Sequence, residues 1–482
     1  MKLIFEKSIE GRPFALLPPD DVEVYELPAA IQRSCAPRLP ELTEGELARH
    51  YTALENKVFG VNCGFYPLGS CTMKYNPKIN EEIAKNPGFA EIHPLQPGHT
   101  VQGCLEALHL AERLFCEITG MDNMTFQPAA GAHGEFTGLN LIKKYHGSRG
   151  ETHRDKLIVP DTAHGTNPAT ATMASFKTVT VPSKPDGLVD LEGLRSAVGE
   201  DTAGLMLTNP NTLGLFEKDI AEIARIVHDA GGLLYYDGAN LNPVLGIVRP
   251  GDMGFDIVHL NLHKTFATPH GGGGPGSGPC GCKAFLSMYL PVPRVVEEDG
   301  EFRFSGDYPE SIGKVKAFYG NFAVLLKALT YTLMLGREGC VHVAQAAVLN
   351  ANYFMKRLDD LYDVAFPGRC MHEFVLSAQR LKKETGVTAM DIAKGLLDNG
   401  MHPPTVYFPL NVHEALMVEP TETESKATMD EAAEVYRELY RLAYSDPEAL
   451  QEAPVKTAVR RLDEVSAARK PILKYNFEEP SP

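Results

Sequence analysis

Short apolar segments alternate with amphipathic segments along the middle of the chain. Six apolar stretches have the length of buried strands, at residues 123–126, 156–159, 178–181, 204–207, 233–236 and 257–260. Apolar residues recur at helical spacing between them, for example at 134–145 and 220–230. Strands that alternate with helices predict a mostly parallel sheet covered by helices on both faces. Ligands of such sheets bind beyond the carboxyl ends of the strands.

The same pattern divides the chain into three predicted regions. Residues 1–103 are rich in proline and glycine and predict an extended N-terminal arm, with a helical patch at 44–56. Residues 104–335 form the predicted large domain, which ends in a helix at about 321–335. Residues 336–482 predict a smaller C-terminal α/β domain with a βαβ-like pattern and an irregular tail. Its expected elements are a strand at 374–376 and helices at 388–398 and 428–444.

Two charged residues follow consecutive predicted strands of the large domain. Asp237 ends the strand at 233–236, and Lys264 follows the strand at 257–260. A run of small residues, 271–279, comes next. A pyridoxal phosphate (PLP) site needs a lysine that forms a Schiff base and an acid that keeps the pyridinium nitrogen protonated. Each residue alone would equally suit a salt bridge.

Three upstream segments complete an ordered series of strand ends. In residues 127–135 (QPAAGAHGE), small side chains let Gly131, Ala132 and a helix N-terminus approach a phosphate. The ring of His164 could stack on a planar cofactor. The amide of Asn209 could donate a hydrogen bond to the phenolic oxygen of PLP. The structural alternatives are a tight strand-to-helix turn, a structural histidine and a proline turn. The order of these segments together with Asp237 and Lys264 predicts PLP binding.

Composition narrows the class of protein. The 482 residues carry a net charge of -16, which provides no basic excess for binding nucleic acid. We identify no signal peptide and no membrane-length apolar run, so we expect a cytoplasmic protein. Nine irregularly spaced cysteines do not predict a disulfide framework. The pair Cys280 and Cys282 suits a metal poorly, and we interpret these residues as buried against a sheet.

Longer strings carry a specific resemblance. The chain resembles fold-type I PLP-dependent transferases and, within them, the P-protein of the glycine cleavage system, a glycine decarboxylase. The strings that carry it are 69–77 (GSCTMKYNP), 93–97 (HPLQP), 163–168 (AHGTNP), 259–266 (HLNLHKTF) and 419–422 (EPTE). The resemblance spans about residues 60–470.

Length sharpens what this resemblance implies. The one-chain P-protein is roughly twice as long, and this chain resembles its lysine-bearing C-terminal half. The resemblance therefore implies subunit 2 of a two-subunit glycine dehydrogenase (aminomethyl-transferring), an oxidoreductase. It implies a homologous subunit 1, with two copies of each subunit, and decarboxylation of glycine. The aminomethyl group would pass to the lipoyl arm of H-protein.

The resemblance also suggests residue roles. It makes Lys264, His164 and His263 the catalytic candidates, with His263 or His270 as a proton relay. The family often has polar residues where this chain has Ala129, Ala130 and His133, so backbone amides, Thr265 or the partner would bind the phosphate. Ser70, Cys71, Thr72 and Lys74 are candidates for lining the site or the lipoyl route. Residues 271–278 are expected to border that route, where a bulky residue at Gly272 would impair lipoyl-dependent turnover.

Two other functions stay open at this point. The string around Lys264 also suits another fold-type I enzyme, such as an amino-acid decarboxylase or a hydroxymethyltransferase. A non-catalytic scaffold subunit that has kept the fold is the third possibility. The joint presence of Lys264, Asp237 and His164 argues against a scaffold.

Overall fold

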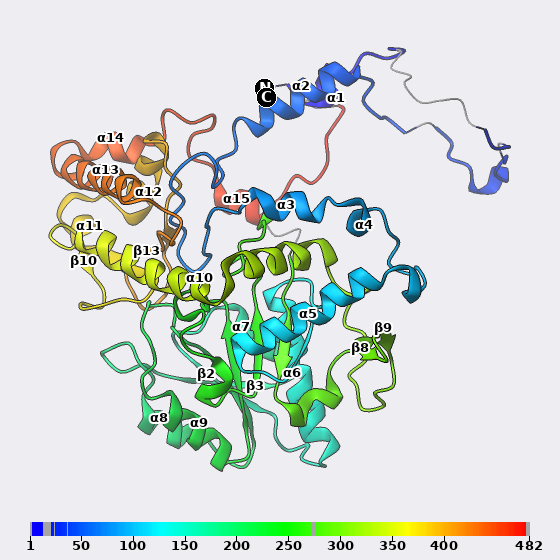
Figure 1. Ribbon diagram of the computed structural model, residues 1–482. Coiled ribbons are helices and arrows are strands. Elements are labelled where there is room, and N and C mark those ends of the chain that lie inside the picture. The colour runs from blue at the N-terminus through cyan, green and yellow to red at the C-terminus, as the bar shows by residue number, and fades with distance from the viewer. Residues whose placement is uncertain (1, 13–20, 24, 36, 272–275, 479–482) are drawn as a thin grey trace. The chain divides into compact units, whose positions relative to one another are not determined.

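The computed structural model describes residues 2–12, 21–23, 25–35, 37–271 and 276–478 (Figure 1). Contacts divide the chain into two compact units, Met1–Gly60 with Val455–Pro482, and Val61–Pro454. The first unit contains the helices α1 (Ile4–Lys7), α2 (Glu44–Glu55) and α15 (Glu464–Arg469). The predicted site residues all lie in the second unit. Gly272 and the rest of 272–275 lie outside the described residues.

A seven-stranded sheet forms the centre of the second unit. Its order is β1-β7-β6-β5-β4-β2-β3, and only β7 runs antiparallel to its neighbours. The strands are β1 (Asn123–Thr125), β2 (Lys156–Pro160), β3 (Lys177–Val181), β4 (Thr202–Thr208), β5 (Leu233–Gly238), β6 (Ile257–Leu260) and β7 (Cys280–Cys282). The six predicted strands and their parallel arrangement are confirmed. Cys280 and Cys282 are buried in β7, as interpreted.

Alternate residues of the strands enter two different hydrophobic cores. Leu234 and Tyr236 pack into one core, while Leu233 and Tyr235 pack into the other. This alternation is expected because successive side chains of a strand point to opposite faces. Apolar residues on both faces explain why these strands have continuous apolar sequences.

Helices cover both faces of this sheet. α5 (Gln102–Thr119), α9 (Ile220–Asp229) and α10 (Phe322–Lys356) contribute to one core, and α6 (Gly131–Ser148) and α7 (Thr166–Met173) to the other. In α9 the buried residues Ile220, Ile223, Ala224 and Val227 recur at helical spacing, which explains why this segment is a helix. The remaining elements are α3 (Lys78–Ala84), α4 (Pro87–Ala90), α8 (Leu191–Ala197), β8 (Arg294–Glu298) and β9 (Glu301–Ser305).

The helix predicted at 321–335 continues well beyond its expected end. α10 spans Phe322–Lys356 with a kink at Gly336, whose φ of 61° and ψ of -172° are not helical. Glycine adopts such a conformation without the penalty of a Cβ atom. The kink coincides with the predicted domain boundary, but the boundaries at 103 and 335 stay predictions.

A separate four-stranded sheet lies in the C-terminal part of this unit. β10 (Asp363–Val364), β11 (Phe374–Ser377), β13 (Ala415–Val418) and β12 (Thr405–Val406) pair in that order. Its helices are α11 (Gln379–Thr385), α12 (Ala389–Asp398), α13 (Lys426–Ser445) and α14 (Pro447–Glu452), of which α12, α13 and α14 group together in Figure 1. Every pairing is antiparallel. These strands and helices confirm the smaller α/β region. The prediction of a βαβ-like arrangement is wrong, because the periodicity of apolar residues does not determine strand direction.

None of the helices formed by the described residues has both the length and the apolar character that crossing a bilayer requires.

Candidate active site

Lys264 lies in the turn that follows β6, at the carboxyl edge of the central sheet. Its side chain is mostly buried, and its Nζ atom donates a hydrogen bond to the backbone oxygen of Ser70 at 2.7 Å. Ser70 belongs to the predicted arm, 194 positions away in the sequence. The arm segment around Ser70 therefore reaches the lysine. Lys74 instead lies buried against Glu422, and a role of Ser70, Cys71 and Thr72 in lining the site stays a prediction.

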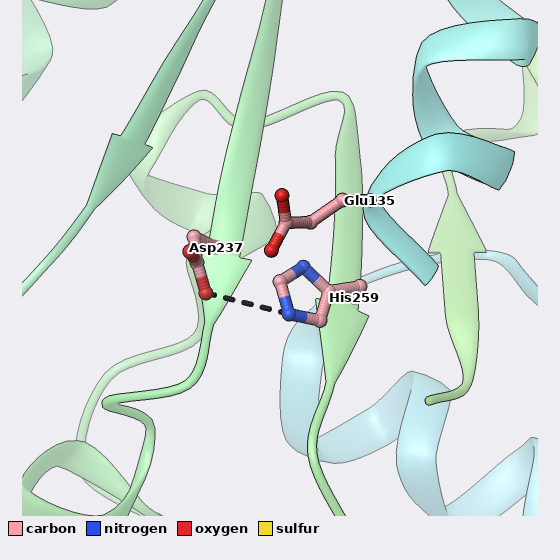
Figure 2. Close-up of side chains that lie close together, drawn as sticks. All are labelled: Glu135, Asp237 and His259. Atoms are coloured by element: carbon pink, nitrogen blue, oxygen red, sulfur yellow. Dashed lines mark ion pairs between the residues drawn. The ribbon is translucent and has the colours of Figure 1, made fainter. Parts of the chain in front are cut away.

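Asp237 is the penultimate residue of β5, the strand next to β6, which Lys264 follows. It is 2% exposed and is the register partner of His259 on β6. The Asn167 amide donates to Oδ2 at 3.0 Å, the Ala239 N–H donates to Oδ1 at 3.0 Å, and His259 Nε2 lies 3.4 Å from Oδ1. Figure 2 shows this pair at the strand ends. Three polar groups therefore surround a carboxylate that would otherwise be costly to bury.

The environment keeps Asp237 ionised. Burial opposes the charge, but the charge of His259 and the donors Asn167 and Ala239 outweigh it, so the pKa of Asp237 lies below its usual value. His259 is oriented in turn by Tyr235, whose hydroxyl lies 2.7 Å from Nδ1. An anion held at this position suits a partner with a positive charge, such as a protonated pyridine nitrogen.

Glu135 joins the same group from helix α6. Oxygen or nitrogen atoms of Glu135, Asp237 and His259 all lie within 4.8 Å of one another (Figure 2). Its carboxylate accepts hydrogen bonds from Thr166 at 2.8 Å and Thr170 at 3.0 Å. Glu135 therefore connects the start of α6 to α7.

His164 lies in the loop between β2 and α7. Its Nδ1 atom is 2.8 Å from the hydroxyl of Thr166, the residue that donates to Glu135. Burial lowers the pKa of His164, so the ring is neutral near pH 7. A neutral, partly buried ring suits stacking on an aromatic cofactor, and that role stays a prediction.

The start of α6 offers the predicted phosphate position. Gly131 begins the helix, and a Cβ atom there would lie 1.9 Å from Oδ1 of Asn261. Ala132 follows in the first turn, where backbone N–H groups are free to bind an anion. The hydroxyl of Thr265 and Oδ1 of Asn261 are buried without a hydrogen-bond partner. Buried polar atoms normally have partners. The hydroxyl of Thr265 can donate to a phosphate oxygen, so this orphaned group fits a bound phosphorylated cofactor.

The amide of Asn209 is engaged within its own turn. Nδ2 donates to the oxygen of Glu217 at 3.3 Å, and Oδ1 accepts from the N–H of Glu217 at 2.9 Å. These bonds favour the structural alternative at this position. A contact to the phenolic oxygen of the cofactor stays a prediction.

His263 and His270 lie next to each other near Lys264. Their ring centroids are 4.9 Å apart. Burial and the neighbouring charge of Lys264 lower the pKa of His263 to about 3 and also lower that of His270. Both rings are therefore neutral at pH 7, and their role as a relay stays a prediction.

Several residues of this site were not among those predicted from the sequence. His259, Asn167 and Glu135 contact Asp237 or its neighbours, and Glu373 and Glu419 lie behind the arm. His259 is recognisable afterwards as a polar residue within an apolar strand, and Asn167 and Glu135 fall inside strings already singled out. Glu419 opens the string 419–422, which was singled out without a role, whereas Glu373 gave no local signal, because tertiary contacts alone bring it to the arm.

Comparisons with known protein families show to which family this chain belongs. The family described as glycine cleavage system P-protein matches residues 19–297, and the family described as glycine dehydrogenase, C-terminal domain, matches residues 343–448. The chain belongs to the glycine cleavage system P-protein family. Its fold and family imply PLP as the cofactor.

Similar P-protein relatives cover essentially the whole chain. A probable glycine dehydrogenase (decarboxylating) subunit 2 from Treponema denticola is 59% identical over 98% of this chain and 98% of its own length. The protein of the same description from Thermococcus gammatolerans is 60% identical over 98% of this chain and 96% of its own length.

Solved structures show the same fold. An inhibitor-bound glycine decarboxylase (P-protein) has a TM-score of 0.72 and 22% identity, covering 86% of this chain and 93% of its own. A NifS-like protein has a TM-score of 0.62 and 14% identity, covering 79% and 100%. The fold-type I architecture is therefore confirmed.

Proposed function

We propose that this chain is the catalytic subunit 2 of a two-subunit glycine dehydrogenase (decarboxylating). It removes the carboxyl group of glycine and passes the aminomethyl group to the lipoyl arm of H-protein. One observation carries the proposal: Lys264 and the ionised Asp237 meet at one sheet edge in a P-protein chain. An amino-acid decarboxylase or hydroxymethyltransferase would share that sheet edge, but not the full-length similarity to subunit 2.

The residues present fit PLP. Lys264 would bind the cofactor covalently, and Asp237 would pair with its ring nitrogen. His164 would stack on the face of the ring. The hydroxyl of Thr265 and the backbone N–H groups of Gly131 and Ala132 would bind the phosphate. When bound, PLP supplies an electron sink for the electron pair that remains on the substrate carbon after CO2 leaves.

The protein's own groups prepare this site. Asp237 stays negative because its three partners offset burial, so it can hold a proton at a ring nitrogen. His263 stays neutral because of burial and the charge of Lys264, so it adds no positive charge beside the lysine. The buried position of Lys264 limits access of water to the place where the substrate would react.

The partner subunit and H-protein complete the proposal. The relatives' description as subunit 2 supports a subunit 1, and we propose two copies of each. Apolar side chains on the surface support such an interface: Ile247 and Leu349 are 53% and 68% exposed and line one surface hollow. Exposed apolar patches of this kind mark interaction sites.

The test is a transfer assay with the assembled enzyme. Subunits 1 and 2 are co-expressed, loaded with PLP and incubated with glycine and lipoylated H-protein, whose mass is then measured. We expect an aminomethyl adduct on the lipoyl group and none on H-protein that lacks it. Adduct-free H-protein together with CO2 release would indicate an ordinary amino-acid decarboxylase instead.

A further inference from the structure

Three buried titratable residues form a second cluster in the same unit. Glu373 and His372 lie just before β11, and Glu419 follows β13. One ligand-type atom from each lies within 4.8 Å of the others, and all three side chains are fully buried. No role in the proposed reaction has been assigned to any of them.

The cluster lacks the cation that its charges would require. Within the described parts of the chain, neither glutamate forms an ion pair with a lysine or arginine. The neighbouring Glu422, by contrast, is bound by Lys74 at 2.7 Å. Both ring nitrogens of His372 and Oε1 of Glu419 have no hydrogen-bond partner. Unpartnered buried atoms of this kind require an explanation.

The two glutamates hold the arm that contacts Lys264. Oε2 of Glu373 accepts from the N–H of Ser70 at 2.7 Å, and Oε2 of Glu419 accepts from the N–H of Thr72 at 3.0 Å. Ser70 and Thr72 have φ angles of 63° and 42°, in the left-handed region that non-glycine residues rarely adopt. The Ser70 oxygen is the acceptor for Nζ of Lys264. The glutamates therefore stabilise a strained turn whose carbonyl orients the lysine.

Two carboxylates this close and this deeply buried cannot both be ionised without a cation. Burial raises the pKa of Glu419 to about 7, and burial together with the charge of Glu419 raises that of Glu373. His372 provides no positive charge, because burial lowers its pKa to about 3. The other charged groups that act on the pair are Lys264, which opposes these shifts, and Glu422, which adds to the shift of Glu419.

We propose that Glu373 and Glu419 share one proton and act as a positioning pair for Lys264. The pair fixes the Ser70–Thr72 turn and presents a single negative charge to the lysine side of the site. Its one retained proton takes the place of a metal ion. The inference rests on the proposed function in one respect, that Lys264 carries the cofactor.

Glutamine variants separate the charge of the pair from its shape. In Glu373→Gln or Glu419→Gln, the amide replaces the protonated acid and one negative charge remains. In the double variant the charge is gone while the volume is kept. Glu424→Gln is the matched control, a partly buried acid in the following loop.

The first readout is the pH titration of visible absorbance of the PLP-loaded, substrate-free two-subunit assembly. Loss of a nearby negative charge destabilises the protonated lysine–cofactor linkage, so the midpoint should fall by about one pH unit in the double variant. Each single variant should shift less than the double. A double variant that titrates like Glu424→Gln would overturn the proposal. Absence of a lysine-linked absorbance in the wild type would instead contradict the proposed function.

The second readout applies even if the double variant fails to fold. Infrared spectra at pH 7 should contain the carbonyl stretch of one protonated carboxylic acid in the wild type, and either single variant should lose it. Metal analysis of the same wild-type sample should find no stoichiometric divalent ion. The proposal of a shared proton would be overturned if both single variants kept the carbonyl band of the protonated acid. It would also be overturned if the wild type held one metal ion per chain that both variants lost.

Discussion

Asp237 and His259 are register partners on adjacent parallel strands, and Oδ1 of the aspartate lies 3.4 Å from Nε2 of the histidine. Tyr235, two residues before Asp237, faces the same side of the sheet and lies 2.7 Å from Nδ1 of His259. The period of a strand and the register of two neighbours thus build a Tyr–His–Asp chain that ends at the proposed pyridine nitrogen.

Replacing His259 should shift the acid limb of the pH–activity profile. Asp237 has a lowered pKa, so it stays ionised as pH falls, and activity persists with it. The charge of His259 is the strongest influence that lowers the pKa of Asp237 against the effect of burial. His259→Phe removes it, so the pKa of Asp237 rises and the acid limb of the profile should move to higher pH by about one unit. Tyr235→Phe should produce a smaller shift in the same direction. A limb that stays in place, or moves to lower pH, would contradict this role.

Removing the hydroxyl of Thr265 should weaken cofactor binding. The buried Oγ1 atom has no protein partner and is proposed to bind the phosphate. Thr265→Ala should raise the Kd for PLP by about tenfold, the equivalent of ~1.4 kcal/mol. Thr265→Ser, which keeps the hydroxyl, should bind nearly as the wild type does. Equal affinities of the alanine variant and the wild type, measured by equilibrium dialysis, would place the phosphate elsewhere.

Glycines of α6 should respond differently to the same substitution. A Cβ atom at Gly138 would lie 2.3 Å from the ring of Tyr235, whereas nothing lies within 4 Å of one at Gly147. Gly138→Ala should therefore destabilise the assembly by about 1–3 kcal/mol. Gly147→Ala should stabilise it by about 0.5–1 kcal/mol, because alanine loses less entropy in a helix. Chemical denaturation that ranks the two variants the other way would contradict the close approach of α6 to β5.

The buried pair of Lys74 and Glu422 should matter more than an exposed one. Nζ of Lys74 donates to Glu422 at 2.7 Å, to Asn242 at 2.9 Å and to Tyr331 at 3.2 Å. Lys74→Met leaves a buried charge unpaired and should cost about 3–5 kcal/mol in unfolding free energy. Lys85→Met, in the exposed pair with Glu82, should cost less than about 1 kcal/mol. A Lys74→Met/Glu422→Gln double variant more stable than Lys74→Met would confirm that the unpaired charge is the cause.

The sequence predicted the sheet well because its strands are buried on both faces and therefore uniformly apolar. Asp237 was recognisable because it interrupts such a run near a strand end, and Lys264 because it follows the next strand, directly before a run of small residues. Strand direction in the small sheet was not predictable, since apolar spacing is the same for parallel and antiparallel strands. The helix was predicted to end at 335, but apolar residues continue beyond Gly336 and the helix continues with them, with only a kink at the glycine. Glu373 and Glu419 come together only through the pairing of β11 with β13.

Release of labelled CO2 from carboxyl-labelled glycine is the most direct test of the central claim. The two-subunit assembly, loaded with PLP, is compared with its Lys264→Ala variant in the presence of lipoylated H-protein. We predict sustained release by the wild type and a rate lower by roughly 10⁴-fold or more in the variant. Release at a similar rate from both assemblies would contradict the assignment of Lys264 as the lysine that holds the cofactor.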